Sequence, residues 1–136
     1  MGNGPLSIFQ VSGRAMSAQL VRMNTTASNL ANANTVASSP EAAYRTIKPV
    51  FRTAFDQASG MSTVDVERIV TAGAEPTKRY DPGNPMADKD GNIWESGVDE
   101  TRELVDMLET ARTYQNNVEV MQTAKQLITD TLKLGR

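Results

Sequence analysis

The chain has 136 residues, a length that suits one domain or one compact unit with an insertion. It contains no cysteine and no histidine, which excludes disulfide frameworks, thiolate sites, most hydrolytic triads and the commonest metal ligand. The 14 basic and 16 acidic residues give a net charge of −2 and are mixed along the chain, so no positive field is available to hold a nucleic acid.

The first predicted element is a helix from about residue 5 to residue 33. Apolar or small residues recur there at steps of four and three, the spacing of the a and d positions of a coiled coil. This seam consists of Phe9, Gly13, Met16, Leu20, Met23, Ala27 and Leu30. Pro5 suits the first turn of the helix, and a polar cluster at residues 32–40 ends the pattern. At about 1.5 Å per residue, the helix would be roughly 40 Å long.

The middle of the chain follows a different pattern. Residues 44–55 are rich in β-branched and aromatic side chains, and residues 63–70 alternate apolar with charged side chains, so we expect a β-hairpin. Residues 76–94 are mostly turns, with a short third strand expected at residues 92–94. Residues 88–93 resemble the centre of a calcium-binding loop, but the first and last acidic ligands are missing, which favours an ordinary Asp-Gly turn.

The last predicted element is a second helix, from about residue 98 to residue 134, which would be roughly 55 Å long. Its seam repeats the spacing of the first helix with one interruption. The seam consists of Leu104, Met107, Ala111, Tyr114, Val118, Met121, Lys125, Ile128 and Leu132. Ser96 and Asp99 have the spacing of a capping box, which places the start of the helix close to them.

These elements predict a mainly α fold, in which long N- and C-terminal helices form a coiled-coil-like pair with a small inserted β-hairpin and loop region. Residues 1–36 would be the N-terminal helix of a discontinuous assembly core, residues 37–97 the insertion, and residues 98–136 the C-terminal helix of the core. A pair of helices leaves much apolar surface uncovered, and this chain has few large residues with which to cover it. We therefore expect the seams to pack in a larger assembly.

Both ends of the chain resemble the terminal signatures of bacterial flagellar axial proteins. Residues 24–35 read NTTASNLANANT and follow Ile8-Phe9 and Ser12-Gly13, while residues 111–125 read ARTYQNNVEVMQTAK. With its short middle segment, which includes YDPGNP at residues 80–85, the chain is similar to the flagellar basal-body rod proteins. The resemblance covers nearly the whole chain and is strongest to the proximal rod members.

The resemblance implies a structural, non-enzymatic subunit that polymerises through its terminal helices into the torque-transmitting shaft. It further implies export by the flagellar type III apparatus without a cleavable signal peptide, and a place in the rod that spans the periplasm. The implied partners are further copies of the chain, proximal rod proteins of the FlgB and FlgF types, and a FliE-type adaptor. No cofactor, metal, small-molecule substrate or nucleic acid is implied.

The expected assembly surface combines the two apolar seams with asparagines of the first helix. It comprises Phe9, Met16, Leu20, Met23, Asn24, Asn29, Leu30, Asn32, Leu104, Met107, Tyr114, Val118, Met121, Ile128 and Leu132. The polar row Thr25, Asn29 and Asn32 admits two interpretations: a solvated face at a fraying helix end, or buried amides that fix the register of packed helices. The family resemblance favours the second, which predicts that Asn29→Ala weakens assembly more than it alters monomer helicity.

Two other classes of function compete with a rod subunit. A soluble coiled-coil adaptor or export chaperone would also present amphipathic helices without catalytic groups, but it should fold stably alone and bind its cargo with a defined stoichiometry. A peptidoglycan hydrolase would need two carboxylates that share a cleft, and nothing in the sequence marks such a pair.

Overall fold

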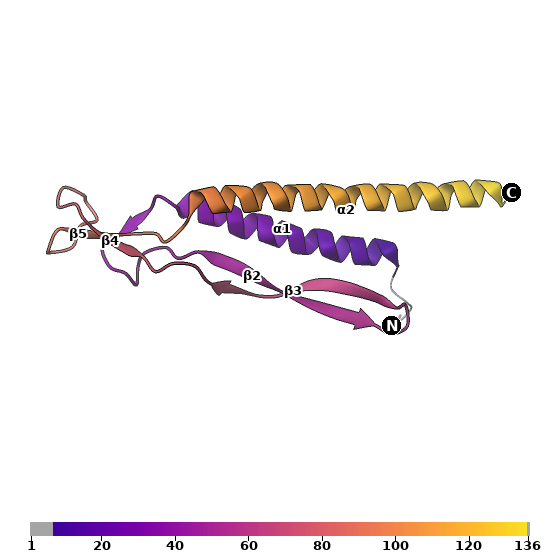
Figure 1. Ribbon diagram of the computed structural model, residues 1–136, viewed down its shortest axis with the longest axis horizontal. Helices are drawn as coiled ribbons and strands as arrows, with labels where there is room; N and C mark the ends of the chain where they lie inside the picture. Colours follow the sequence, from indigo (N-terminus) through magenta and orange to yellow (C-terminus); the bar gives the residue numbers. More distant parts are fainter. Residues whose placement is uncertain (1–6, 136) are drawn as a thin grey trace.

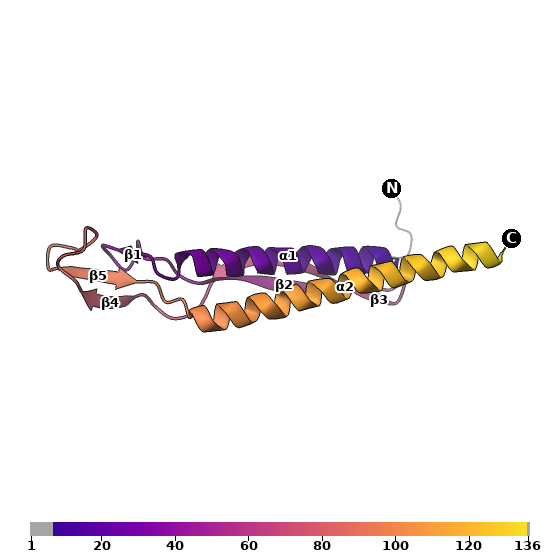
Figure 2. The same cartoon turned by 90° about the horizontal axis from the view of Figure 1, so that it is seen from above.

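The computed structural model describes residues 7–135, which form an elongated molecule (Figure 1). Two helices, α1 (Ile8–Asn32) and α2 (Glu100–Leu134), run in opposite directions side by side (Figures 1 and 2). The described residues also contain the strands β1 (Val36–Ala37), β2 (Ile47–Asp56), β3 (Met61–Thr71), β4 (Thr77–Tyr80) and β5 (Asn92–Glu95), which form two sheets. Neither helix, over the residues described, is apolar enough to cross a membrane.

Helix α1 begins with a capping box. Gln10 N–H donates to Ser7 Oγ at 3.3 Å, and Ser7 N–H donates to Gln10 Oε1 at 2.9 Å, so two amides that the helix leaves unpaired are satisfied reciprocally. The predicted role of Pro5 lies outside the described residues. The helix ends at Asn32, close to where the polar cluster predicts its end.

Helix α2 begins after Asp99, whose Oδ1 accepts the N–H of Arg102 at 3.2 Å. Ser96 does not cap the helix as the capping-box pattern suggested. Its hydroxyl instead donates to the carbonyl oxygen of Ala33, so that it ties the segment before α2 to the end of α1.

The predicted hairpin is confirmed, and it is long. Strands β2 and β3 pair antiparallel from Ile47 opposite Thr71 to Asp56 opposite Met61, with one irregularity in the register midway. Gly60 has φ +68° in the connecting turn, a conformation that favours glycine. The hairpin lies along α1, which it follows for most of the length of that helix (Figure 1).

A small sheet in the order β1-β5-β4 forms the end of the molecule opposite the C-terminus of α2 (Figure 1). Strand β5 confirms the third strand expected at residues 92–94, whereas β1 and β4 were not predicted. The β4–β5 connection contains the Asp-Gly turn, in which Asp88 Oδ1 accepts the N–H groups of Asp90 and Asn92 and Gly91 has φ +79°.

The expectation of a mainly α fold with a small insertion is wrong. Strands account for 24% of the described residues and helices for 47%, and the chain forms two sheets. The helices are not an isolated coiled-coil pair, because α1 lies between α2 and the hairpin and packs against both (Figure 1). The a/d spacing shows which side chains share a helix face, but it does not show which face the rest of the chain covers.

The interior is unusually polar. Among the described residues, the buried hydrophobic side chains are Ala18, Ala37, Ala43 and Ile93. The buried polar or charged side chains are twice as many, namely Ser12, Thr25, Thr26, Asn29, Thr46, Thr63, Glu103 and Thr110. The contacts between the elements therefore rest on small side chains and hydrogen bonds more than on a large apolar core.

Candidate assembly surface

Helix α1 turns its small and polar side chains toward the rest of the chain. Its buried residues are Ser12, Ala18, Thr25, Thr26 and Asn29. The predicted apolar seam lies elsewhere on the helix and stays partly exposed, with Leu20 at 44%. Most of the other seam residues are half-buried, so α1 packs inside the chain mainly through its small and polar side chains and only in part through the seam.

Asn29 joins three elements through one side-chain amide. Its Nδ2 donates to the carbonyl oxygen of Ile47 at 2.9 Å and to Glu103 Oε2 at 3.0 Å. Its Oδ1 accepts the N–H of Ile47 at 3.0 Å and the hydroxyl of Tyr44 at 2.8 Å. An amide offers two donor hydrogens and two acceptor positions, so all four are used. Asn29, which is 1% exposed, thereby holds α1 to the start of β2 and to the first turn of α2.

The polar row of α1 thus acts within the chain. Thr25 Oγ1 donates to the carbonyl oxygen of Arg22 at 2.8 Å, and Asn32 Nδ2 donates to that of Ser28 at 2.9 Å. These two groups bond to their own helix, and the amide of Asn29 has no hydrogen-bonding group left for a neighbouring subunit. Of the three residues, Asn29 is the one that fixes the register of α1 against β2 and α2.

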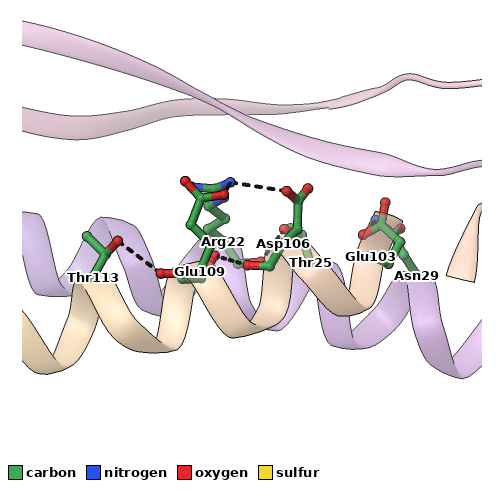
Figure 3. Close-up of polar contacts among 8 residues, drawn as sticks. Arg22, Thr25, Asn29, Glu103, Asp106, Glu109 and Thr113 are labelled. Atoms are coloured by element: carbon green, nitrogen blue, oxygen red, sulfur yellow. Dashed lines mark hydrogen bonds and ion pairs between the residues drawn. The ribbon is translucent and has the colours of Figure 1, made fainter. Parts of the chain in front are cut away.

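Ion pairs complete the attachment of α1. Arg22 Nη2 lies 3.4 Å from Asp106 Oδ1 and 3.8 Å from Glu109 Oε2, so one guanidinium bridges two carboxylates of α2 (Figure 3). On the hairpin side, Arg14 Nη1 lies 3.4 Å from Asp65 Oδ2. The Arg14–Asp65 pair is exposed, and exposed pairs contribute about 0–1 kcal/mol, so it orients α1 more than it stabilises it.

Helix α2 buries Glu103 and Thr110, neither of which was among the predicted site residues. A signal for them is present in the sequence, because Glu103, Thr110, Asn117 and Ala124 recur every seven residues and form a stripe of small or polar side chains beside the apolar seam. The same stripe in α1 contains Ser12 and Thr26. The large apolar side chains of the neighbouring seam have the stronger periodic pattern, so apolar periodicity alone does not identify these buried residues.

Large apolar side chains of both helices face solvent instead. The exposed ones are Ile8, Leu20, Leu104, Val105, Leu108, Val120, Leu127, Ile128, Leu132 and Leu134. Extensive exposed apolar surface marks sites of protein–protein contact.

Exposed large apolar side chains are most numerous in the second half of α2. A shallow groove of about 550 Å³ runs between the first turn of α1 and α2, lined by Ile8, Asn116, Glu119, Val120, Thr123, Ala124 and Leu127. Beyond this groove, α2 projects past the start of α1 (Figures 1 and 2). Within residues 7–135, the C-terminal residues of α2 therefore have no partner helix.

The predicted surface residues fall into three groups. Exposed are Leu20, Asn24, Leu104, Ile128 and Leu132. Half-buried are Phe9, Met16, Met23, Leu30, Asn32, Met107, Tyr114, Val118 and Met121. Asn29 is buried and belongs to the intramolecular contacts described above.

Comparison with known proteins decides the family. The model for the flagella basal body rod protein matches residues 9–36, and that for the C-terminal region of the flagellar basal body rod FlgEFG proteins matches residues 89–134. The chain is 40% identical over 131 residues to the flagellar basal-body rod protein FlgC of Yersinia enterocolitica, which covers 96% of this chain and 98% of the relative. The chain belongs to the FlgC family of flagellar basal-body rod proteins.

Other FlgC proteins are similar over the same span. Identity is 39% to FlgC of Salmonella typhimurium over 96% of this chain and 98% of the relative, and 31% to FlgC of Agrobacterium fabrum over 96% and 95%. As a FlgC-family member, the chain is a structural subunit of the flagellar rod and not an enzyme, and it assembles with other rod proteins. The adaptor or chaperone alternative is not favoured.

Proposed function

We propose that the chain polymerises through α1 and α2 into the torque-transmitting shaft of the proximal rod. Residues 1–36 and 98–136 form the discontinuous assembly core in this proposal, and residues 37–97 pack outside it. The supporting observation is that the fully buried side chains are mostly polar or small, while the large apolar side chains of both helices are exposed or only half-buried. A subunit with this distribution gains apolar burial only when other subunits cover its helices.

The strongest support for this proposal comes from the part of α2 that projects past α1. Leu127, Ile128 and Leu132 are 62%, 48% and 68% exposed on a helix that α1 no longer accompanies. Full burial of such a side chain contributes about 1.5–3 kcal/mol, so three of them provide a substantial part of a subunit contact. Many such contacts acting in parallel would let the shaft transmit torque although each dispersion contact is weak.

We further infer the neighbours, the export route and the location of the chain from the family resemblance. The neighbours in the rod are further copies of the chain, proximal rod proteins of the FlgB and FlgF types, and a FliE-type adaptor. The chain reaches the rod through the flagellar type III export apparatus without a cleavable signal peptide, and the rod section that it builds spans the periplasm.

Leu127→Asp tests the helix surface. We expect the variant to fold normally as a monomer, because Leu127 is 62% exposed, and to be lost from purified basal bodies, with loss of motility in a strain that lacks the unmodified gene. Gln122→Asp is the matched control, since it places the same charge at an exposed polar position of α2. Basal bodies that contain normal amounts of Leu127→Asp would refute the proposal.

A further inference from the structure

Lys125 is the one charged residue in the apolar seam of α2. It is exposed, and within residues 7–135 it forms no ion pair within 4.0 Å. Ile128 and Leu132 follow it at steps of three and four, and we call these three residues the C-terminal ridge. Both apolar members are exposed, and the end of α2 projects past α1 (Figures 1 and 2). The ridge therefore presents two large apolar side chains and a cation to a partner outside the chain.

A second ridge with the same spacing lies at the start of α2. It consists of Thr101, Leu104 and Leu108, and we call it the N-terminal ridge. Leu104 and Leu108 are 53% and 72% exposed, and Glu100, which directly precedes the ridge, is exposed as well. Each member lies 24 positions before its counterpart in the C-terminal ridge. A displacement of about 36 Å along the axis would therefore bring the two ridges of neighbouring helices to the same height.

The two ridges lie on different sides of α2. Among the elements of the described chain, α2 packs against α1, so the fully buried Thr110 faces α1. Ile128 lies 18 positions later, which is five turns of 3.6 residues, and thus continues the side that faces α1. Leu108 lies two positions before Thr110, about 200° around the helix, and so belongs to the outer side. A contact between the two ridges is consequently heterologous, the kind of contact that builds rings or open helical arrays from identical chains.

The charges beside the two ridges are complementary. When the ridges face each other on parallel helices, Lys125 comes opposite Thr101 and beside Glu100, and its flexible side chain can reach the carboxylate. Within residues 7–135, Glu100 has no cationic partner within 4.0 Å. Asp106 and Asp130 also come to the same height, but each lies on the far side of its helix from the contact. The contact therefore joins unlike charges and separates like ones.

We propose that the C-terminal ridge of one copy packs against the N-terminal ridge of a second copy, with the two α2 helices parallel and displaced by about 36 Å. The facing pairs are Ile128 with Leu104, Leu132 with Leu108, and Lys125 with Glu100. The proposal rests on the proposed function, and it names the partner and the register of one helix contact. A second copy is the partner because one chain carries both ridges and both charges. The contact covers four large apolar side chains that the monomer exposes.

Reversal of the two charges tests the pairing. Glu100→Lys and Lys125→Glu each bring like charges together, so we expect the amount of each variant in purified basal bodies to fall by about fivefold or more. The double variant restores an opposite pair, and we expect it to recover at least about half of the unmodified amount. Glu100 and Lys125 lie 25 positions apart on one helix, about 38 Å, so this recovery can come only from a contact between chains.

The charge reversals have defined outcomes against the proposal. A double variant that enters basal bodies no better than the single variants would overturn the pairing with a second copy, as would a normal amount of either single variant. Glu100 Oε1 also accepts a hydrogen bond from Asn34 Nδ2 at 2.5 Å, so Asn34→Ala is the matched control that removes this bond and keeps the charge. We expect Asn34→Ala to enter normally. An equal loss for Asn34→Ala and Glu100→Lys would assign Glu100 to the fold and overturn the pairing.

A pair of cysteines reports the register directly, because the chain contains no other cysteine. In Leu108→Cys/Leu132→Cys, we expect mild oxidation of purified basal bodies to link the chain into dimers and longer oligomers, since facing positions come within disulfide range. Each single variant should form none. Leu108→Cys/Gln126→Cys is the matched control, because Gln126 is exposed two positions before Ile128, on the opposite side of α2. No oligomers, or equal amounts in the control pair, would overturn the proposal.

Leu127→Asp in the same strain separates this proposal from the proposed function. Normal incorporation of Leu127→Asp would refute helix-mediated assembly as a whole, and the ridge contact with it. Loss of Leu127→Asp together with a charge-reversed double variant that does not recover would overturn the ridge contact alone.

Discussion

Replacing Asn29 with alanine should weaken the fold of the monomer strongly. The change removes four hydrogen bonds and leaves both backbone groups of Ile47 and the carboxylate of Glu103 without that partner. At about 1 kcal/mol net for each bond, and with water from the cleft that Asn29 lines between α1 and β2 replacing part of the loss, we expect a decrease of about 3–4 kcal/mol in the free energy of unfolding. Single domains have about 5–15 kcal/mol in total, so this is a large fraction.

The measurement is urea unfolding of the purified chain, followed by far-UV circular dichroism. Asn24→Ala is the matched control, because Asn24 is an exposed asparagine of the same helix, and its change should stay within about 0.5 kcal/mol. Equal unfolding midpoints for the two variants would refute the reasoning. If Asn29→Ala unfolded like the unmodified chain but failed to enter basal bodies, the amide would act between subunits, as the sequence first suggested.

Two further predictions concern the backbone. A Cβ at Gly97 would collide with the carbonyl oxygen of Ala74, so Gly97→Ala should destabilise the fold by about 1–3 kcal/mol. A Cβ at Gly13 would meet nothing within 4 Å, so Gly13→Ala should stabilise the fold by about 0.5–1 kcal/mol. Melting temperatures that shift in the same direction for both variants would contradict this. Ser7→Ala removes one half of the capping box and should lower the stability of the helix start by about 1 kcal/mol. We expect faster amide hydrogen exchange in the first turn of α1. Unchanged exchange there would show that the cap is unimportant.

The positions of the helices and of the hairpin could be predicted because local pattern specifies them. Steps of three and four at residues 9–30 and 104–132 indicate helices, and β-branched or alternating side chains at residues 44–55 and 63–70 indicate strands. Strand β4 could not be found in this way, since all four of its residues are exposed and show no alternation. Its place depends on backbone pairing with β5.

The packing of the helices could not be predicted, because it depends on residues far apart in the sequence. An apolar seam has the same spacing whether its partner lies in the same chain or in another subunit, so the seam of α1 did not show that Thr25 and Thr26 are the residues buried inside. Glu103 likewise bonds to Asn29, which lies 74 positions earlier. The role of the predicted surface residues in assembly stays a prediction.

The central claim is that the exposed apolar face of α2 becomes covered in the rod. The chain contains no cysteine, so a single cysteine at Leu132, which is 68% exposed, can be labelled selectively with a maleimide. We predict rapid labelling of Leu132→Cys in the monomer and much slower labelling in purified basal bodies, with full reactivity restored when the rods are dissolved in denaturant. Equal labelling rates in monomer and rod would contradict the account.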